Sequence, residues 1–367
     1  MLKNLLHNDN VKKGALYTFF SFVNNGISFV LLLILAHYLL PEDYGYLNLY
    51  NTFVQVVSII IALGTNSYIG NAYFQKTRKE MYQVIMVVFL TTFAILSLLS
   101  LSLLIFPNQF SGLIGIPVLY LWMALFICFF QAFTNINLDI WRLEEKPVSY
   151  GLFSMSIAIL NFIITFLFIV GMKKGWEGRI YAQMIVASTF FILSFVMMIK
   201  RGYLVLKIPP KAIVIETFLY GIPLVPHMAS FWLKQGVDRY IINYFYEASE
   251  VGLYSFALNF AAVIGIIGTA FNANNSVYMY KNLAEGYEKK KHSLKRIARL
   301  MTFVFAGVFA LIWLGASAGI PMILPKYTGS VKFLFPICLG AFFQCMYLLY
   351  VNYLFFYKKT KQLMYIT

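Results

Sequence analysis

Long apolar runs recur along the whole chain and constrain its fold more than any other feature of the sequence. The run at residues 85–106 is long enough for a helix to cross a bilayer, which takes about 20 predominantly apolar residues. Charged residues make up only 12% of the chain, whereas a soluble domain carries roughly 25%. That leaves too little charge to cover a soluble surface. The sequence therefore predicts an all-α polytopic membrane protein.

We expect about ten transmembrane helices, at residues 15–40, 46–70, 81–106, 117–138, 149–171, 180–199, 216–245, 252–278, 300–323 and 331–357. The first run is too long for the core of a cleavable signal, roughly 7–15 residues, and we interpret it as a retained helix. The second and eighth helices are rich in Asn. Such helices can span a bilayer only if their polar faces are hidden from lipid.

The basic residues predict the orientation of these helices. Of the 29 Lys and Arg residues, 22 fall in segments that share one side of the membrane, 5 fall on the other, and Lys234 and Arg239 fall within the seventh helix. The positive-inside rule then places the amino terminus in the cytoplasm. The net charge of +15 is explained as a topology signal that faces anionic lipid headgroups. Nucleic acid is therefore not an expected partner.

The sequence carries few signals of catalysis or metal binding. Cys128, Cys338 and Cys345 lie in apolar runs without a CxxC pair, which indicates buried free thiols rather than a disulfide or metal site. There is no Walker A motif for nucleotide binding. The outer loops, at about ten residues or fewer by the predicted spans, are too short to hold a catalytic domain. We predict no enzyme activity, no metal and no cofactor.

An internal repeat indicates how the helices are organised. Residues 37–53 and 243–260 share an aromatic helix end, an acidic turn, a glycine and a Tyr- and Asn-rich helix start; residues 145–150 and 359–365 form a second pair. Each separation covers six helices, so the two halves face the same way, as in a parallel repeat. We predict a first six-helix bundle at 1–207 and a second at 208–367, truncated after about four helices. The alternative is a natural ten-helix protein.

The same segments carry a family resemblance. Residues 34–53 resemble the first hairpin of the polysaccharide transporters in the multidrug/oligosaccharidyl-lipid/polysaccharide superfamily. Residues 220–260 resemble helices seven and eight of Wzx-type O-antigen and capsule repeat-unit flippases. The matching motifs are a G-x-P, an Asp-Arg pair and a G-x-Y-S, here Gly221 and Pro223, Asp238 and Arg239, and Gly252, Tyr254 and Ser255. The resemblance extends over essentially the whole chain.

This resemblance implies a function. It implies two helical bundles around a central cavity that opens to one side at a time, in the bacterial inner membrane. It implies a flippase that moves undecaprenyl-diphosphate-linked oligosaccharide repeat units to the periplasmic leaflet, with a polysaccharide polymerase and glycosyltransferases as further partners. The coupling ion, H⁺ or Na⁺, stays open. The alternative is an ion-coupled multidrug exporter of the same superfamily, whose cationic substrates would favour buried carboxylates.

Helix seven is the predicted substrate site. Pro223 and Pro226 should kink it and serve as a hinge. Beyond them the chain places Lys234, Gln235, Asp238 and Arg239 within the predicted span, where charge is costly and by default suggests function. We expect Lys234 and Arg239 to attract a diphosphate, with Asp238 holding Arg239. The alternative is that these side chains reach outward to the lipid headgroups.

Amide side chains form a second group of candidates. Asn25, Asn51 and Asn259 could bind sugar hydroxyls from helices one, two and eight. They could equally be hydrogen-bond partners between helices, which is the favoured interpretation. Asp139 and Arg142 are expected to form an ion pair at the inner end of helix four, with a coupling-ion role for Asp139 as the weaker alternative.

Overall fold

The computed structural model describes residues 9–205 and 207–357, except for the side chains of residues 9–11, 231, 235, 273, 274, 277 and 355. All regular structure in these segments is helical. Ten helices there are long and apolar enough to cross a membrane, which confirms the predicted all-α, polytopic fold. The predictions that concern the side chain of Gln235 and the repeat at 359–365 lie outside the described residues.

The chain forms two compact units, Met1–Val251 and Gly252–Thr367. The three segments of helix seven belong to the first unit because they pack on its helices. The boundary between these compact units follows Val251, whereas the predicted boundary between the two sequence repeats follows residue 207. The repeat boundary stays a prediction.

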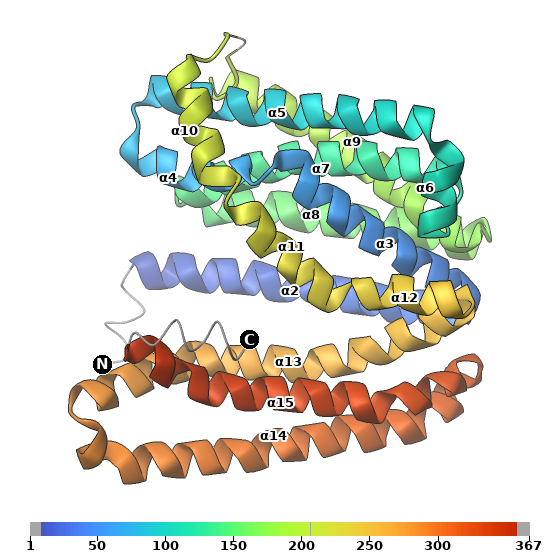
Figure 1. Ribbon diagram of the computed structural model, residues 1–367, viewed down its shortest axis with the longest axis vertical. Helices are drawn as coiled ribbons and strands as arrows, with labels where there is room; N and C mark the ends of the chain where they lie inside the picture. The colour runs from blue at the N-terminus through green and yellow to red at the C-terminus, as the bar shows by residue number, and fades with distance from the viewer. Residues whose placement is uncertain (1–8, 206, 358–367) are drawn as a thin grey trace. The chain divides into compact units, whose positions relative to one another are not determined.

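The first unit is built around one buried helix. Its main helices are α2 (Asp9–Tyr38), α3 (Pro41–Ala62), α4 (Tyr68–Gln75), α5 (Arg78–Ile105), α6 (Pro107–Ile114), α7 (Val118–Leu143), α8 (Pro147–Phe166) and α9 (Gly175–Lys200). Helix α7 packs against α3, α5, α8 and α9, and Figure 1 shows α5, α7, α8 and α9 running side by side. Stacked and edge-on phenylalanine rings fill this core, including Phe89, Phe133 and Phe191.

Helix seven is divided into three parts, α10 (Lys211–Gly221), α11 (Leu224–Gln235) and α12 (Val237–Phe245). Helix α10 packs on α4 and α5, while α11 and α12 pack on α3. Two short helical turns complete the unit, the 3-10 turn η1 (Thr65–Ser67) before α4 and the π-helical turn η2 (Leu167–Gly171) after α8.

The second unit consists of α13 (Ala248–Ala284), α14 (Tyr287–Ile323), the 3-10 turn η3 (Pro325–Ser330) and α15 (Val331–Phe356). Its core includes Ile264, Phe305, Cys338 and Cys345. All three cysteines of the chain are free and buried, which confirms the prediction made from their apolar surroundings.

Two predicted helix boundaries differ from the structure more than the others do. The second helix ends at Ala62 rather than at residue 70, because Leu63 and Gly64 adopt left-handed backbone conformations, with φ of 45° and 68°. The ninth helix begins at Tyr287 rather than at residue 300. Its first turns carry the basic cluster at 289–299, so these charges extend a membrane helix instead of forming a loop.

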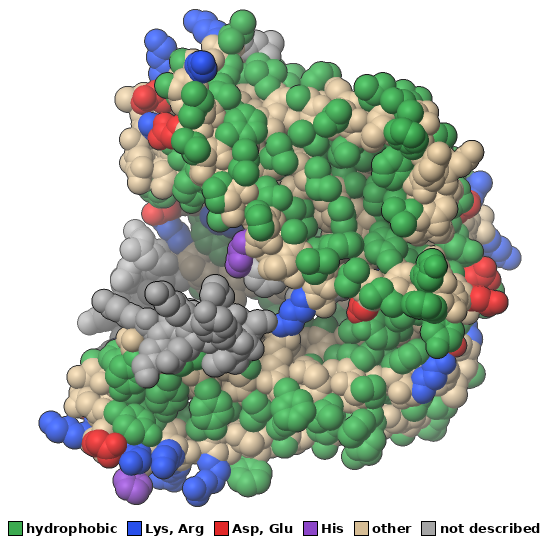
Figure 2. Space-filling view, in the orientation of Figure 1, with side chains coloured by type: hydrophobic (Ala, Val, Ile, Leu, Met, Phe, Trp, Pro, Cys, Tyr) green, Lys and Arg blue, Asp and Glu red, His purple; other side chains and the backbone are tan. Residues whose placement is uncertain are grey.

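The surface of each unit is apolar enough for contact with the acyl chains of lipid. Large side chains such as Phe22, Leu311 and Met322 are 78%, 75% and 82% exposed, and Figure 2 shows hydrophobic side chains over most of the visible face of both units. Exposed apolar surface on this scale is unfavourable in water. The protein is therefore a multi-pass membrane protein.

The end of α10 approaches the turn after α3 very closely. A Cβ atom added to Gly64 would lie 2.3 Å from the carbonyl oxygen of Gly221, and one added to Gly221 would lie 2.8 Å from the backbone of Gly64 and Thr65. Only glycine fits at both positions, and Gly64 also needs its left-handed conformation. This contact fixes the place where the first segment of helix seven meets the first unit.

Gly221→Ala should therefore lower the stability of the purified protein. The added methyl group forces two backbones apart, and overpacking of this kind costs about 1–3 kcal/mol. Gly70→Ala is the matched control, since a Cβ at Gly70 in α4 meets nothing within 4 Å. Thermal unfolding in detergent should show a lower Tm for Gly221→Ala alone. An equal Tm for both variants would contradict the proposed close packing.

Candidate functional site

Helix seven is interrupted twice. The first interruption falls at Ile222 and Pro223, between α10 and α11, and Pro226 lies in the first turn of α11, where proline is tolerated. The second falls at Gly236, between α11 and α12. The positions of the prolines did not predict this second break. The break at Gly236 places Lys234 in α11 and the Asp238 and Arg239 pair in α12, so these charged residues do not lie on one continuous helix.

The second interruption is held against α3. The indole nitrogen of Trp232 donates to the carbonyl oxygen of Thr52 at 3.2 Å, and the hydroxyl of Tyr240 donates to the carbonyl oxygen of Leu49 at 3.2 Å. Between them, a Cβ at Gly236 would lie 2.9 Å from the Trp232 indole nitrogen and 3.0 Å from the Thr52 methyl group. A glycine therefore lets the break lie on α3, in the path that Figure 1 shows for α11 and α12.

The predicted charged residues of helix seven flank this break. Lys234 is exposed in the last turn of α11. In α12 the guanidinium of Arg239 lies 3.6 Å from the carboxylate of Asp238, which also accepts a 2.9 Å hydrogen bond from the Arg239 backbone amide. The side chains of Arg239 and Asp238 are 15% and 32% exposed. The arrangement leaves Lys234 accessible in α11 and the Asp238–Arg239 ion pair partly buried in α12.

The predicted asparagines do not form one cluster in the first unit. Asn25 is exposed on α2, and Asn51 is half-buried on α3. Asn259 belongs to α13 of the second unit, where its amide donates to the carbonyl oxygen of Ser255 at 3.0 Å. Asn24 bonds Ser154 of α8 at 3.1 Å, a contact of the interhelical kind.

Sequence reasoning missed Arg179. It was assigned to an outer loop, but it lies in the second turn of α9. Its guanidinium donates to the side-chain oxygen of Asn161 and, at 2.8 Å, to the hydroxyl of Thr165, both on α8. Within the described part of the chain, no carboxylate pairs with it. The spacing of Asn161 and Thr165, four residues apart in an apolar run, was the available signal.

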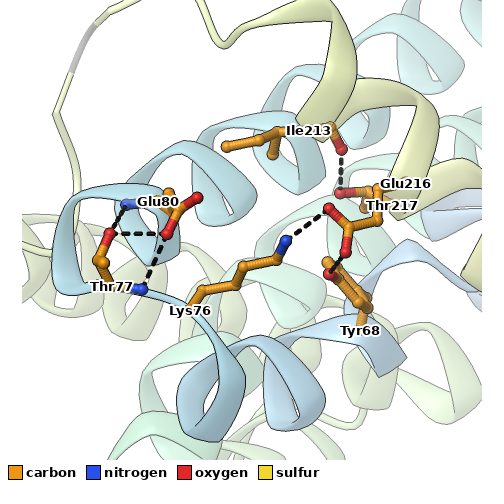
Figure 3. Close-up of polar contacts among 7 residues, drawn as sticks. All are labelled: Tyr68, Lys76, Thr77, Glu80, Ile213, Glu216 and Thr217. Atoms are coloured by element: carbon orange, nitrogen blue, oxygen red, sulfur yellow. Dashed lines mark hydrogen bonds and ion pairs between the residues drawn. The ribbon is translucent and has the colours of Figure 1, made fainter.

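A cluster of polar contacts ties α10 to the loop between α4 and α5 (Figure 3). The carboxylate of Glu216 in α10 lies 2.8 Å from the Lys76 ammonium and accepts a 2.5 Å hydrogen bond from the Tyr68 hydroxyl. The hydrogen bond to Glu216 raises the pKa of Lys76. Burial raises the pKa of Tyr68, and the carboxylate of Glu216 raises it further. These contacts anchor the start of helix seven.

A second cluster surrounds Glu144, between α7 and α8. Its carboxylate accepts hydrogen bonds from Arg201 at 2.7 Å and Tyr203 at 2.6 Å, and lies 2.9 Å from the Lys146 ammonium. Burial alone would raise the pKa of Glu144, but these donors outweigh it and hold the pKa below its ordinary value. Nearby, the expected ion pair of Asp139 with Arg142 forms at 2.7 Å.

The fold defines a class of protein, a multi-pass helical membrane protein. Its likeness to solved transporters of the MATE family is extensive. An inward-facing multidrug resistance MATE transporter of the MOP superfamily has a TM-score of 0.65 at 16% identity and covers 92% of this chain and 80% of its own. A MATE in complex with Br-NRF has a TM-score of 0.60 at 14% identity, over 98% of each chain.

The family follows from sequence. The model of the polysaccharide biosynthesis protein family matches residues 11–277, and the chain belongs to this family, as its motifs predicted. Two Haemophilus influenzae proteins are similar at 24% identity. "Lsg locus putative protein 1" aligns over 95% of this chain and 86% of its own length, and an "Uncharacterized membrane protein" over 96% and 85%.

Glu144→Gln should make the Tm of the protein change less with pH in the acid range. Because the folded state depresses the pKa of Glu144 below its ordinary 4.5, its stabilisation is present above pH 4.5 and is lost as the pH falls through the depressed value. The Tm of native protein should exceed that of Glu144→Gln at pH 7, and the difference should shrink as the pH falls below 4.5 through the depressed pKa. The control is Glu145→Gln, an exposed neighbour that pairs with Lys13. A difference that persists at low pH would contradict this assignment.

Proposed function

We propose that this protein is a flippase that moves polyprenyl-diphosphate-linked oligosaccharide repeat units from the cytoplasmic to the periplasmic leaflet of a bacterial inner membrane by alternating access. The observation that carries the proposal is the family match over residues 11–277. It supports a substrate of polysaccharide synthesis, and the MATE-like fold supports movement of that substrate by a transporter. The amino terminus is proposed to be cytoplasmic, from the distribution of Lys and Arg.

The charges of the first unit suit an anionic substrate. A diphosphate needs cations or amide donors in place of water. Lys234 is exposed beside the break in helix seven, and Arg179 is held by neutral oxygens alone. Arg239, with Asp238 beside it, supplies a further cation whose position its partner fixes. Lys234 is proposed to make the first contact with the diphosphate.

The breaks in helix seven suit a conformational cycle. Interruptions at Pro223 and Gly236 divide it into segments that can change their angles separately. Two contacts fix the ends of this path, the Glu216 carboxylate to Lys76 and the Tyr240 hydroxyl to the carbonyl of Leu49. Pro223 and Pro226 are proposed as the hinge.

The remaining parts of the proposal concern the sugar, the coupling ion and the partner proteins. Asn25, Asn51 and Asn259 are proposed as sugar contacts. H⁺ or Na⁺ is proposed as the coupling ion, and a polymerase and glycosyltransferases are proposed as partners.

The second candidate is an ion-coupled multidrug exporter. The observation that favours it is the likeness to a structure described as a multidrug resistance transporter. A cavity for cationic drugs would favour unpaired carboxylates. In the described part of helix seven, Glu216 and Asp238 both have cationic neighbours, at 2.8 Å and 3.6 Å. We therefore place this candidate second.

Deletion of the gene tests the two candidates against each other. Loss of a flippase should cause the lipid-linked glycan to accumulate on the cytoplasmic face, and restoring the gene should relieve it. Sidedness is measured with a membrane-impermeant glycan-modifying reagent on oriented vesicles. If no glycan accumulates and the deletion strain is instead more sensitive to toxic organic cations, the flippase proposal fails and the exporter replaces it.

Lys234→Gln should slow glycan transport about tenfold, which corresponds to about 1.4 kcal/mol of lost interaction. The substitution leaves a polar side chain that is one atom shorter and removes the charge that attracts the diphosphate. Transport is measured with purified protein in vesicles that contain fluorescent undecaprenyl-diphosphate oligosaccharide. Lys174→Gln is the matched control, an exposed lysine outside helix seven. Native rates for Lys234→Gln would remove this residue from the site.

A further inference from the structure

The second unit contains a large groove that the proposed transport function does not use. It has a volume of about 910 Å³ and lies between α14 and α15. Lys295, Arg299 and Phe303 line it from α14, Tyr347 and Tyr350 line it from α15, and Tyr357 lines it from directly after the end of α15. All of its lining residues belong to one unit, so the groove is a property of this helix pair alone.

The helical spacing explains how the groove is formed. Lys295, Arg299 and Phe303 follow one another at intervals of four residues, which places them on one face of α14. Tyr347, Tyr350 and Leu354 recur at three or four residues on α15 and line the groove, and Tyr357 follows directly after the end of this helix. The two faces meet because α14 packs against α15. On the open side, Phe303 and Tyr350 are 70% and 54% exposed.

The groove has a cationic part and an apolar part. Lys295 lies two turns before Phe303, a rise of roughly 12 Å along the helix. The cationic part lies toward the α13–α14 turn, where Figure 2 shows basic side chains gathered. The positive-inside rule predicts this end to be cytoplasmic. The apolar part, with Phe303, lies deeper in the predicted span.

The two groove cations are not neutralised by the protein. Acidic side chains lie nearby, but Glu285 pairs with Lys290 at 2.9 Å and Glu288 pairs with Lys291 at 3.3 Å. Lys295 and Arg299 have no carboxylate partner within the part of the chain that the structure describes. Two neighbouring positive charges beside an apolar surface favour a ligand that brings its own negative charge.

The chemistry of the groove matches an amphiphile with an anionic head. An arginine guanidinium can bind phosphate oxygens in pairs, and a lysine adds a second charge. Tyrosine presents an apolar ring and a polar tip, a combination suited to the membrane interface. Basic pockets between transmembrane helices on the cytoplasmic side bind lipid headgroups elsewhere. A zwitterionic lipid would bring its own ammonium group toward these cations and bind less well.

We propose that the groove between α14 and α15 is a binding site for an anionic phospholipid of the phosphatidylglycerol type. Its phosphate contacts Lys295 and Arg299, the tyrosine hydroxyls of α15 surround the headgroup, and an acyl chain extends past Phe303. The lipid holds the two helices together on the side where they present these charges. The site is distinct from helix seven and does not depend on the flippase proposal.

Photo-crosslinking tests the proposal. The full chain is reconstituted into vesicles that contain equal fractions of photoactivatable phosphatidylglycerol or phosphatidylcholine, and labelled peptides are identified by mass spectrometry. Phosphatidylglycerol should label residues 287–303 and 347–357 at least fivefold more than phosphatidylcholine does. Lys295→Gln with Arg299→Gln should abolish this preference. Lys289→Gln with Arg296→Gln removes the same charge from exposed positions of α14 outside the groove and should keep it.

Four results would overturn the proposal. Equal labelling by the two lipids, or an equal loss of preference in both double variants, would mean a general attraction to a basic surface. Stronger labelling by a photoactivatable polyprenyl phosphate would assign the groove to another lipid. Because the groove variant could unfold, native protein is also heated with each lipid in detergent. Phosphatidylglycerol should raise its Tm by several degrees more than phosphatidylcholine, and equal shifts would also contradict the proposal.

Discussion

The bilayer offers no water to an unpaired backbone amide or carbonyl, and this constraint governs every feature of the first unit. Helices satisfy their own backbone groups, so an interrupted helix is tolerated only where protein covers the break. Both interruptions of helix seven meet this condition. The first lies beside the contact of Gly221 with Gly64, and the second lies on α3 at Thr52. The glycines matter because only a residue without Cβ lets the broken backbone come close enough to be covered.

The same constraint explains which parts of the fold could be predicted from sequence. Apolar runs long enough to span lipid are local properties of the chain, so the ten spans were found. The end of α3 was missed because the left-handed residues Leu63 and Gly64 interrupt an apolar run without changing its hydropathy. The start of α14 was missed because a basic helix continuing beyond the membrane has the composition of a loop.

The candidate site was harder to predict, because its polar groups act through tertiary contacts. Intramembrane charge indicated Lys234 and Arg239, and the structure places them on either side of a break that the sequence did not reveal. Arg179 could not be recognised by hydropathy, since it begins a helix and resembles a loop cation. Its acceptors, Asn161 and Thr165, belong to a different helix. Two residues of opposite charge can be recognised in a sequence as a possible ion pair. A charged residue whose partners are neutral, such as Arg179, gives no comparable signal.

The burial of the three cysteines has a practical consequence. Cys128, Cys338 and Cys345 are at most 2% exposed, so water-soluble maleimides should not reach their sulfur atoms in the folded protein. A single cysteine introduced on the exposed face of α11 would then carry a fluorophore or spin label selectively, without first replacing the native thiols. The protein as it stands is therefore suited to site-selective labelling of helix seven.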